Sequence, residues 1–262
     1  MPPGHINAIF LTDANIAQKD FNDTFKKAKK QGAFIFWNHP NWKSPDTKFD
    51  QDGIPQWFDE HTKMLENGVL MGIEVVNARS YSKEAHQWCI NKNLTLVANS
   101  DIHTPIGMEY DLTKEHRPTT LIFAKERSQD GIKEALMNRR TSIWFEDNII
   151  GSREFLNPLF EECVKIKDTK YLENLAVVTI ENTSSINFIL ENTGEYSFFN
   201  KTNFITLNAN SEINLLVKTG KLLEEFKLDF DVKNMIIAPD KYLNVELVCK
   251  KTGLITDKKQ TK

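Results

Sequence analysis

Three side chains that can bind divalent metal ions stand directly after short apolar runs of the sequence. His39 follows the run Ala33–Trp37, and Asp101 and His103 follow the run Leu94–Ala98. If these runs are strands of an α/β sheet or barrel, the three side chains lie at the carboxyl ends of strands, where such folds collect their ligands. Imidazole and carboxylate groups suit an ion whose bound hydroxide attacks phosphorus or a carbonyl carbon. We therefore expect the three side chains to converge on one site.

The same residues also permit a plainer interpretation. A single histidine near a strand end is more often a hydrogen-bonded structural residue than a metal ligand, so spacing alone leaves both roles open. The tryptophans near the His39 loop present a similar choice. Trp37, Trp42 and Trp57 could wall a pocket, but at least two of them are expected to be ordinary core residues.

The other histidines and the cysteines show no arrangement typical of a site. His61 and His86 fall within expected helices and are interpreted as structural or solvated, and His116 lies in a loop without an evident partner. The sequence contains no GxSxG, GxxxxGK[ST] or GxGxxG motif. The cysteines are odd in number and far apart, which excludes a disulfide framework and a CxxC zinc knuckle; they are Cys89, Cys163 and Cys249.

Apolar strands and amphipathic helices alternate through residues 1–150. The helices between the strands carry recognisable signals, such as Gly32 at a C-terminus and Ser82 and Ser128 as N-caps. Alternation with short connections forms right-handed βαβ units, and therefore predicts a parallel sheet or barrel. The expected strands are Ile6–Leu11, Ala33–Trp37, Val69–Val76, Leu94–Ala98, Thr119–Ala124 and Thr141–Phe145.

The pattern changes after residue 150. Residues 151–172 are expected to form a linker region with a helix near Arg153–Lys165. In residues 173–262, apolar and polar residues alternate in short stretches separated by breaks that contain asparagine or glycine, which indicates an antiparallel β-sandwich. These stretches begin at Leu175, Ile186, Ile213 and Phe226.

Length and composition place the chain among globular proteins. Its 262 residues are 40% hydrophobic and 26% charged, enough for one large or two modest domains. No apolar run approaches the roughly 18 residues of a membrane span. No signal peptide is recognised near Met1, so a cytoplasmic location is the default and a periplasmic one is possible if a signal lies upstream. The net charge of −3 gives no bulk attraction to nucleic acid.

Four motifs resemble those of PHP-domain phosphoesterases, the polymerase and histidinol phosphatase superfamily. The motifs are Pro3-Gly4-His5-Ile6-Asn7-Ala8-Ile9-Phe10-Leu11, Asn38-His39-Pro40, Gly72-Ile73-Glu74-Val75-Val76-Asn77 and Asn99-Ser100-Asp101-Ile102-His103. The resemblance covers about residues 1–150 and is strongest at Asp101 and His103. The part after about residue 155 resembles the β-sandwich that is appended to some bacterial members of this group.

The resemblance implies a distorted seven-stranded (β/α) barrel with up to three divalent ions, Zn, Mn or Fe, at the carboxyl ends of its strands. By motif, His5 and His39 would bind one metal, Asp101 a second and His103 a third. Asp101 and His103 would also be catalytic. The implied reaction is hydrolysis of a phosphate mono- or diester by metal-bound hydroxide, with a phosphorylated small molecule or nucleotide as substrate.

The sequence departs from the family pattern at its beginning. The family's opening His-x-His motif, its next acidic and histidine ligands and a bridging glutamate precede the motif that contains His5, and this chain has no His-x-His. We therefore expect an α/β fold with a partial PHP barrel that lacks its first strands, followed by an all-β sandwich domain. The chain is expected to be an N-terminally truncated phosphoesterase, incomplete as given. The alternative is a non-catalytic PHP remnant, or a binding protein that acts through its β-sandwich.

Overall fold

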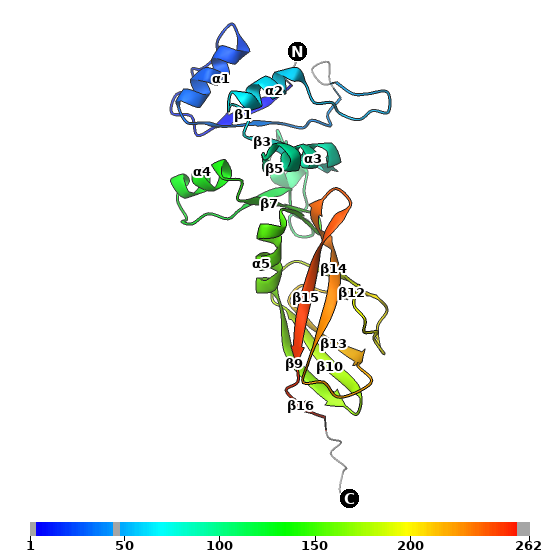
Figure 1. The fold of residues 1–262 in the computed structure, drawn as a ribbon. Helices are drawn as coiled ribbons and strands as arrows, with labels where there is room; N and C mark the ends of the chain where they lie inside the picture. The colour runs from blue at the N-terminus through cyan, green and yellow to red at the C-terminus, as the bar shows by residue number, and fades with distance from the viewer. Residues whose placement is uncertain (1–3, 44–47, 256–262) are drawn as a thin grey trace, which may run out of the picture. The chain divides into compact units, whose positions relative to one another are not determined.

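A computed structural model describes residues 4–43 and 48–255 of the chain. The chain divides into two compact units, Met1–Phe155 and Leu156–Lys262, and Figure 1 labels many of their elements. Both units contain many fully buried apolar side chains. None of the helices in the described ranges has the length and apolar character needed to cross a bilayer.

Parallel strands form the centre of the main sheet in the first unit. β2 (Phe34–Trp37) pairs with β3 (Gly72–Asn77), which pairs in turn with β5 (Thr95–Asn99), both in parallel register. All three strands are almost wholly buried, as is typical of parallel strands covered on both faces. Two further strands, β1 (Ile6–Ile9) and β4 (Ser80–Tyr81), pair antiparallel with β2 and β3 respectively.

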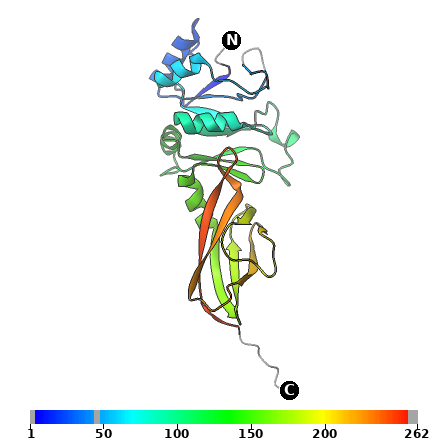
Figure 2. The same ribbon diagram turned by 45° about the vertical axis from the view of Figure 1, so that its right-hand side comes forward.

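The helices of the first unit lie between its strands in the sequence, and side-chain caps fix the starts of several of them. Ser82 and Ser128 each accept a hydrogen bond from the backbone N–H three residues on, which is the N-cap geometry predicted for both. α3 packs against β3 and β5, and Figure 2 shows this helix in teal. The helices are α1 (Phe21–Lys30), α2 (Asp59–Glu66), α3 (Lys83–Lys92), the 3-10 helix η1 (Ile106–Met108) and α4 (Gln129–Met137).

The antiparallel pairing of β1 differs from the wholly parallel sheet that the sequence predicts. Ile9 lies opposite Phe34 and Ile6 lies opposite Trp37, so the last residue of β1 and the first residue of β2 lie at the same end of the sheet. The connection through α1 therefore begins and finishes at that end, whereas a βαβ connection runs from one end of the sheet to the other. As a result, His5 at the start of β1 lies beside the carboxyl end of β2.

The last strands of the first unit form an antiparallel ladder. β6 (Thr119–Ile122) pairs with β7 (Thr141–Phe145), which pairs with β8 (Asn148–Gly151). The Thr120 hydroxyl accepts a hydrogen bond from the Ala98 N–H at 2.9 Å and donates to the Ala98 carbonyl at 3.0 Å, which links β6 to β5. The predicted partial, distorted seven-stranded (β/α) barrel is therefore not confirmed, because the described strands of this unit are of mixed direction.

Close packing in the parallel sheet requires a glycine at the start of β3. A Cβ atom at Gly72 would lie 2.8 Å from the Phe34 ring and 3.0 Å from the carbonyl oxygen of Thr95. A backbone oxygen cannot move aside as the end of a flexible side chain can. Gly72 therefore permits β2, β3 and β5 to approach one another at this end of the sheet.

The second unit begins with a four-stranded sheet. α5 (Arg153–Cys163) spans the division between the units and runs directly into β9 (Val164–Leu172). The strand order is β13-β10-β9-β16, with β16 parallel to β9 and the other pairs antiparallel. β9 forms the last nine residues of the region predicted as a linker. It was not predicted as a strand, because its polar residues obscure the alternation of buried and exposed positions. The other strands are β10 (Leu175–Asn182), β13 (Ser211–Lys218) and β16 (Gly253–Leu254).

Four more antiparallel strands complete the second unit. They are β11 (Phe188–Asn192), β12 (Phe204–Leu207), β14 (Glu225–Ala238) and β15 (Lys241–Lys250). Alternate residues of these strands are buried, in agreement with the period that predicted a β-sandwich. At the end of β10, the Asn182 side-chain amide donates to the carbonyls of Ile186 and Asn208 and so ties two loops together.

Candidate metal site

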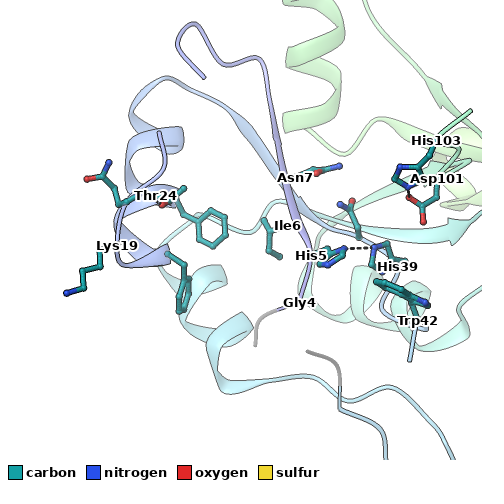
Figure 3. A pocket seen from close by; sticks show the side chains of 14 residues that line it. Gly4, His5, Ile6, Asn7, Lys19, Thr24, His39, Trp42, Asp101 and His103 are labelled. Atoms are coloured by element: carbon teal, nitrogen blue, oxygen red, sulfur yellow. Dashed lines mark hydrogen bonds and ion pairs between the residues drawn. The ribbon is translucent and has the colours of Figure 1, made fainter. Parts of the chain in front are cut away.

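All four predicted ligands line one pocket of about 960 Å³ in the first unit. His39 follows β2 and Asp101 and His103 follow β5, so these three stand after the carboxyl ends of parallel strands. His5 reaches the same edge because it precedes the antiparallel strand β1. Figure 3 shows His5 and His39 together, with Asp101 and His103 nearby. The structure thus brings the four residues together, while their binding of metal stays a prediction.

His5 and His39 form a close pair. Nδ1 of His5 lies 3.0 Å from Nε2 of His39, and the two rings meet edge to face. The other ring nitrogen of His39, Nδ1, is buried and has no hydrogen-bond partner among the described residues. Burial lowers the pKa of His39, and the neighbouring His5 lowers it further, while Asp101 opposes both effects. The surroundings of His39 therefore favour its neutral imidazole, the form that metals bind.

Asp101 and His103 form a second, more open pair. Nε2 of His103 lies 3.6 Å from a carboxylate oxygen of Asp101. The side chain of His103 is 89% exposed and that of Asp101 is 46% exposed. Asp101 adopts a φ of 54° and His39 a φ of 31°, both in the left-handed region that non-glycine residues rarely enter. Such backbone costs about 1–3 kcal/mol per residue and persists only where its surroundings hold it.

A buried carboxylate, which the sequence reasoning missed, lies behind the pocket. Glu74 on β3 is 2% exposed and accepts hydrogen bonds from the His39 N–H and from the side chains of Asn77 and Asn99. Burial raises the pKa of Glu74 to about 7, although these three donors oppose the shift. The signal was available in the sequence, because an acidic residue within the apolar run Val69–Val76 must find partners.

Aromatic side chains complete the wall of the pocket. Trp42 lines it, with its ring 4.9 Å from that of His39 and 5.4 Å from that of His5, centroid to centroid. Trp37 is buried, and its ring stacks on that of Trp88 in the core. Trp57 contacts the same cluster. One of the three tryptophans near the His39 loop therefore belongs to the pocket and two belong to the core.

The remaining histidines lie outside the pocket. His61 and His86 are both fully buried, which agrees with a structural role and excludes a solvated one. Nδ1 of His86 lies 2.8 Å from the Tyr81 hydroxyl. His116, which showed no partner in the sequence, has its two ring nitrogens 2.8 Å from the carbonyl oxygens of Arg117 and Glu146.

The donors present suit a divalent ion but make up an incomplete set. Two nitrogens about 3 Å apart can serve one ion at metal–nitrogen distances near 2.0–2.1 Å, and the His5–His39 separation of 3.0 Å meets this condition. The unpartnered Nδ1 of His39 leaves its ring without the second hydrogen bond that usually orients a metal ligand. Within residues 4–43 and 48–255, no group of three His, Cys, Asp or Glu side chains is arranged to hold one ion. The pocket thus offers two pairs of donors.

A solved structure matches almost the whole chain. It is the crystal structure of a two-domain protein from Bacteroides vulgatus ATCC 8482 that contains a predicted PHP-like metal-dependent phosphoesterase. The two sequences are 42% identical, the match covers 95% of this chain and 71% of that one, and the TM-score is 0.86. The chain belongs to this family of two-domain PHP-like proteins. The resemblance of its first 150 residues to PHP domains, which rested on short motifs, is thereby supported, and the match itself extends over both units.

The second unit of this PHP-like protein also matches a family on its own. Residues 164–248 match the family model described as an Ig-like domain. The matched range starts at the first residue of β9, which supports placing that strand in the β-sandwich. Among curated proteins, none matches the chain.

Proposed function

We propose that this PHP-like protein hydrolyses phosphate mono- or diesters with divalent ions bound in the His5/His39/Asp101/His103 pocket. The observation that carries the proposal is the pair of facing imidazole nitrogens, 3.0 Å apart, in the same pocket as the Asp101 carboxylate. The description of the Bacteroides relative as a predicted metal-dependent phosphoesterase supports it. Ions bound there would neutralise phosphoryl charge and supply hydroxide at neutral pH.

The residues of the pocket offer two kinds of donor to an ion. His5 and His39 offer ring nitrogens, and Asp101 offers a carboxylate that would balance positive charge in the pocket. His103 is exposed beside Asp101 and adds a ring nitrogen to this second pair. Trp42 covers one side of the histidine pair and limits the access of water to it. A phosphorylated small molecule or a nucleotide is the proposed substrate class.

The test measures metal binding and hydrolysis by the 262-residue chain. Calorimetry with Mn²⁺, Zn²⁺ and Fe²⁺ should show binding that His39→Ala and Asp101→Asn each weaken by at least about tenfold. Hydrolysis of an aryl phosphate should depend on the added metal and be lost in the same two variants. His116→Asn is the matched control, because that histidine lies outside the pocket. Absence of binding for all three ions would contradict the proposal.

The number of donors sets the expected strength. Zinc usually takes three or four protein ligands, and each pair here supplies two. We therefore expect weak binding and slow turnover by the 262-residue chain. Robust turnover that disappears in His39→Ala would show that the four residues suffice for catalysis.

A binding role for the Ig-like unit is the second candidate. It is favoured by large aromatic side chains that remain exposed there, Phe199 at 68% and Phe204 at 57%. Apolar side chains exposed to this degree can mark an interaction surface. If binding is the sole function, hydrolysis will be absent at every metal concentration. The quantity to measure is then binding of a partner. Asp101→Asn will leave this binding unchanged, whereas Phe199→Ser will weaken it.

A further inference from the structure

Glu74 joins three strand ends beneath the pocket. One carboxylate oxygen accepts the His39 backbone N–H at 2.5 Å and the Asn77 side-chain amide at 3.1 Å. The other oxygen accepts the Asn99 side-chain amide at 2.7 Å. These donors come from the residues that end β3 and β5 and from the loop after β2, so one buried side chain contacts all three segments.

The hydrogen bonds of Glu74 hold two segments in which a non-glycine residue has a positive φ. The peptide N–H that it holds belongs to His39 itself, whose φ is 31°. Asn99, which it holds through the side-chain amide, stands two residues before Asp101, whose φ is 54°. A peptide group fixed at this point determines the direction in which the following side chain leaves the backbone. One carboxylate therefore constrains both the His39 loop and the loop that carries Asp101.

We propose that Glu74 is a positioning residue, which holds the His39 and Asp101 loops so that their side chains face the same pocket. This inference rests on the proposed function, because positioning matters most if the two loops bind ions together. A merely structural role would be different: Glu74 would then contribute to the stability of the sheet, and its loss would leave the orientation of His39 unchanged.

The test compares Glu74→Gln with Thr95→Val as a matched control. Gln retains the size of the side chain and one acceptor oxygen, but places an amide donor where the second oxygen stood. Thr95 is buried at the opposite end of β5, where its hydroxyl donates to the Leu136 carbonyl at 2.8 Å. Its substitution also removes one buried hydrogen bond, but away from the pocket.

Two measurements separate positioning from stability. In the metal-free protein labelled with ¹⁵N-histidine, six backbone amides are observed, one for each histidine. The His39 amide proton should lie downfield because of its short bond to a carboxylate, and Glu74→Gln should move it upfield while Thr95→Val should not. By calorimetry, Glu74→Gln should weaken Mn²⁺ or Zn²⁺ binding by about 10–100-fold, the usual effect of removing a group that orients a metal ligand.

The outcomes are distinct. If the His39 amide and the metal affinity are the same in Glu74→Gln and the unaltered protein, the positioning role is wrong. If the unaltered chain binds no metal, the proposed function fails, but the His39 amide still decides the role of Glu74. If Glu74→Gln does not fold, Asn99→Ala removes one of the three hydrogen bonds and leaves the carboxylate in place. It should then weaken metal binding by at least about threefold, and an unchanged affinity would overturn the inference.

Discussion

Acidification should destabilise the first unit through His86, a histidine that is buried away from the pocket. Its side chain is 1% exposed, and its ring contacts the Tyr81 hydroxyl through Nδ1. Nε2 has no hydrogen-bond partner among the described residues. Burial lowers the pKa of His86 from 6.5 to about 4 in the folded protein. The perturbation is a decrease in pH from 7 to 5.

The magnitude follows from the two pKa values. Because the unfolded chain binds the proton more tightly, protonation favours unfolding, and stability falls as pH decreases below the unfolded value of 6.5. At about 1.4 kcal/mol per pKa unit, the free energy of unfolding falls by about 2 kcal/mol between pH 7 and pH 5. The loss approaches its full value of about 3 kcal/mol near the folded pKa, below which it grows no further.

Tryptophan fluorescence is a suitable assay, because it reports on the first unit alone. All five tryptophans of the chain lie before residue 156. Urea unfolding would be followed at several pH values for the unaltered protein and for His86→Asn, whose side-chain amide can still contact Tyr81. The difference between the two curves isolates the histidine from the carboxylates, which also titrate in this range. Tyr81→Phe keeps the histidine and should therefore keep the pH dependence.

One result would refute the reasoning. If the stability of His86→Asn falls with decreasing pH as steeply as that of the unaltered protein, His86 does not supply the effect. A similar slope in all three proteins would mean that the folded protein accommodates the charged imidazolium of His86.

Three further substitutions test the packing and hydrogen bonding described above. Gly72→Ala should destabilise the first unit by about 1–3 kcal/mol, because its Cβ meets backbone, whereas Gly107→Ala, with open space around it, should be nearly neutral by the same fluorescence assay. Ser82→Ala removes an N-cap and should cost about 1 kcal/mol, again by fluorescence, with no loss meaning that the cap is dispensable. Asn182→Asp replaces an amide donor that faces carbonyl oxygens, so the melting temperature of the Ig-like unit, measured by calorimetry, should fall. An unchanged melting temperature would contradict the role given to this amide.

The sequence predicted the local elements well because their signals are local. The N-caps Ser82 and Ser128 lie where the helices begin, and the run Ala33–Trp37 corresponds to β2 within one residue. The convergence of His39, Asp101 and His103 on one pocket followed from one general property, that ligands gather at the carboxyl ends of parallel strands.

Strand direction and buried polar partners were harder to predict. The periodicity of Ile6–Leu11 shows a strand, but the direction of pairing depends on where the chain returns after α1, which no local pattern records. The role of Glu74 depends on Asn77 and Asn99, and only the folded sheet brings Asn99 within reach of it. β9 was not predicted as a strand, because several polar residues interrupt the apolar alternation by which the other strands were recognised.

The pairing of β1 with β2 has a consequence for how the protein could be monitored as it folds. His5 and His39 are 34 residues apart in the sequence. Their ring nitrogens face each other only when β1 has paired with β2 on the far side of α1. The unfolded chain lacks this pairing and should have little affinity for an ion, so ligand binding draws the equilibrium toward the folded form. A rise in the thermal midpoint of tryptophan fluorescence with added Mn²⁺ or Zn²⁺ would therefore report occupancy of the pocket. It would do so before any substrate is known.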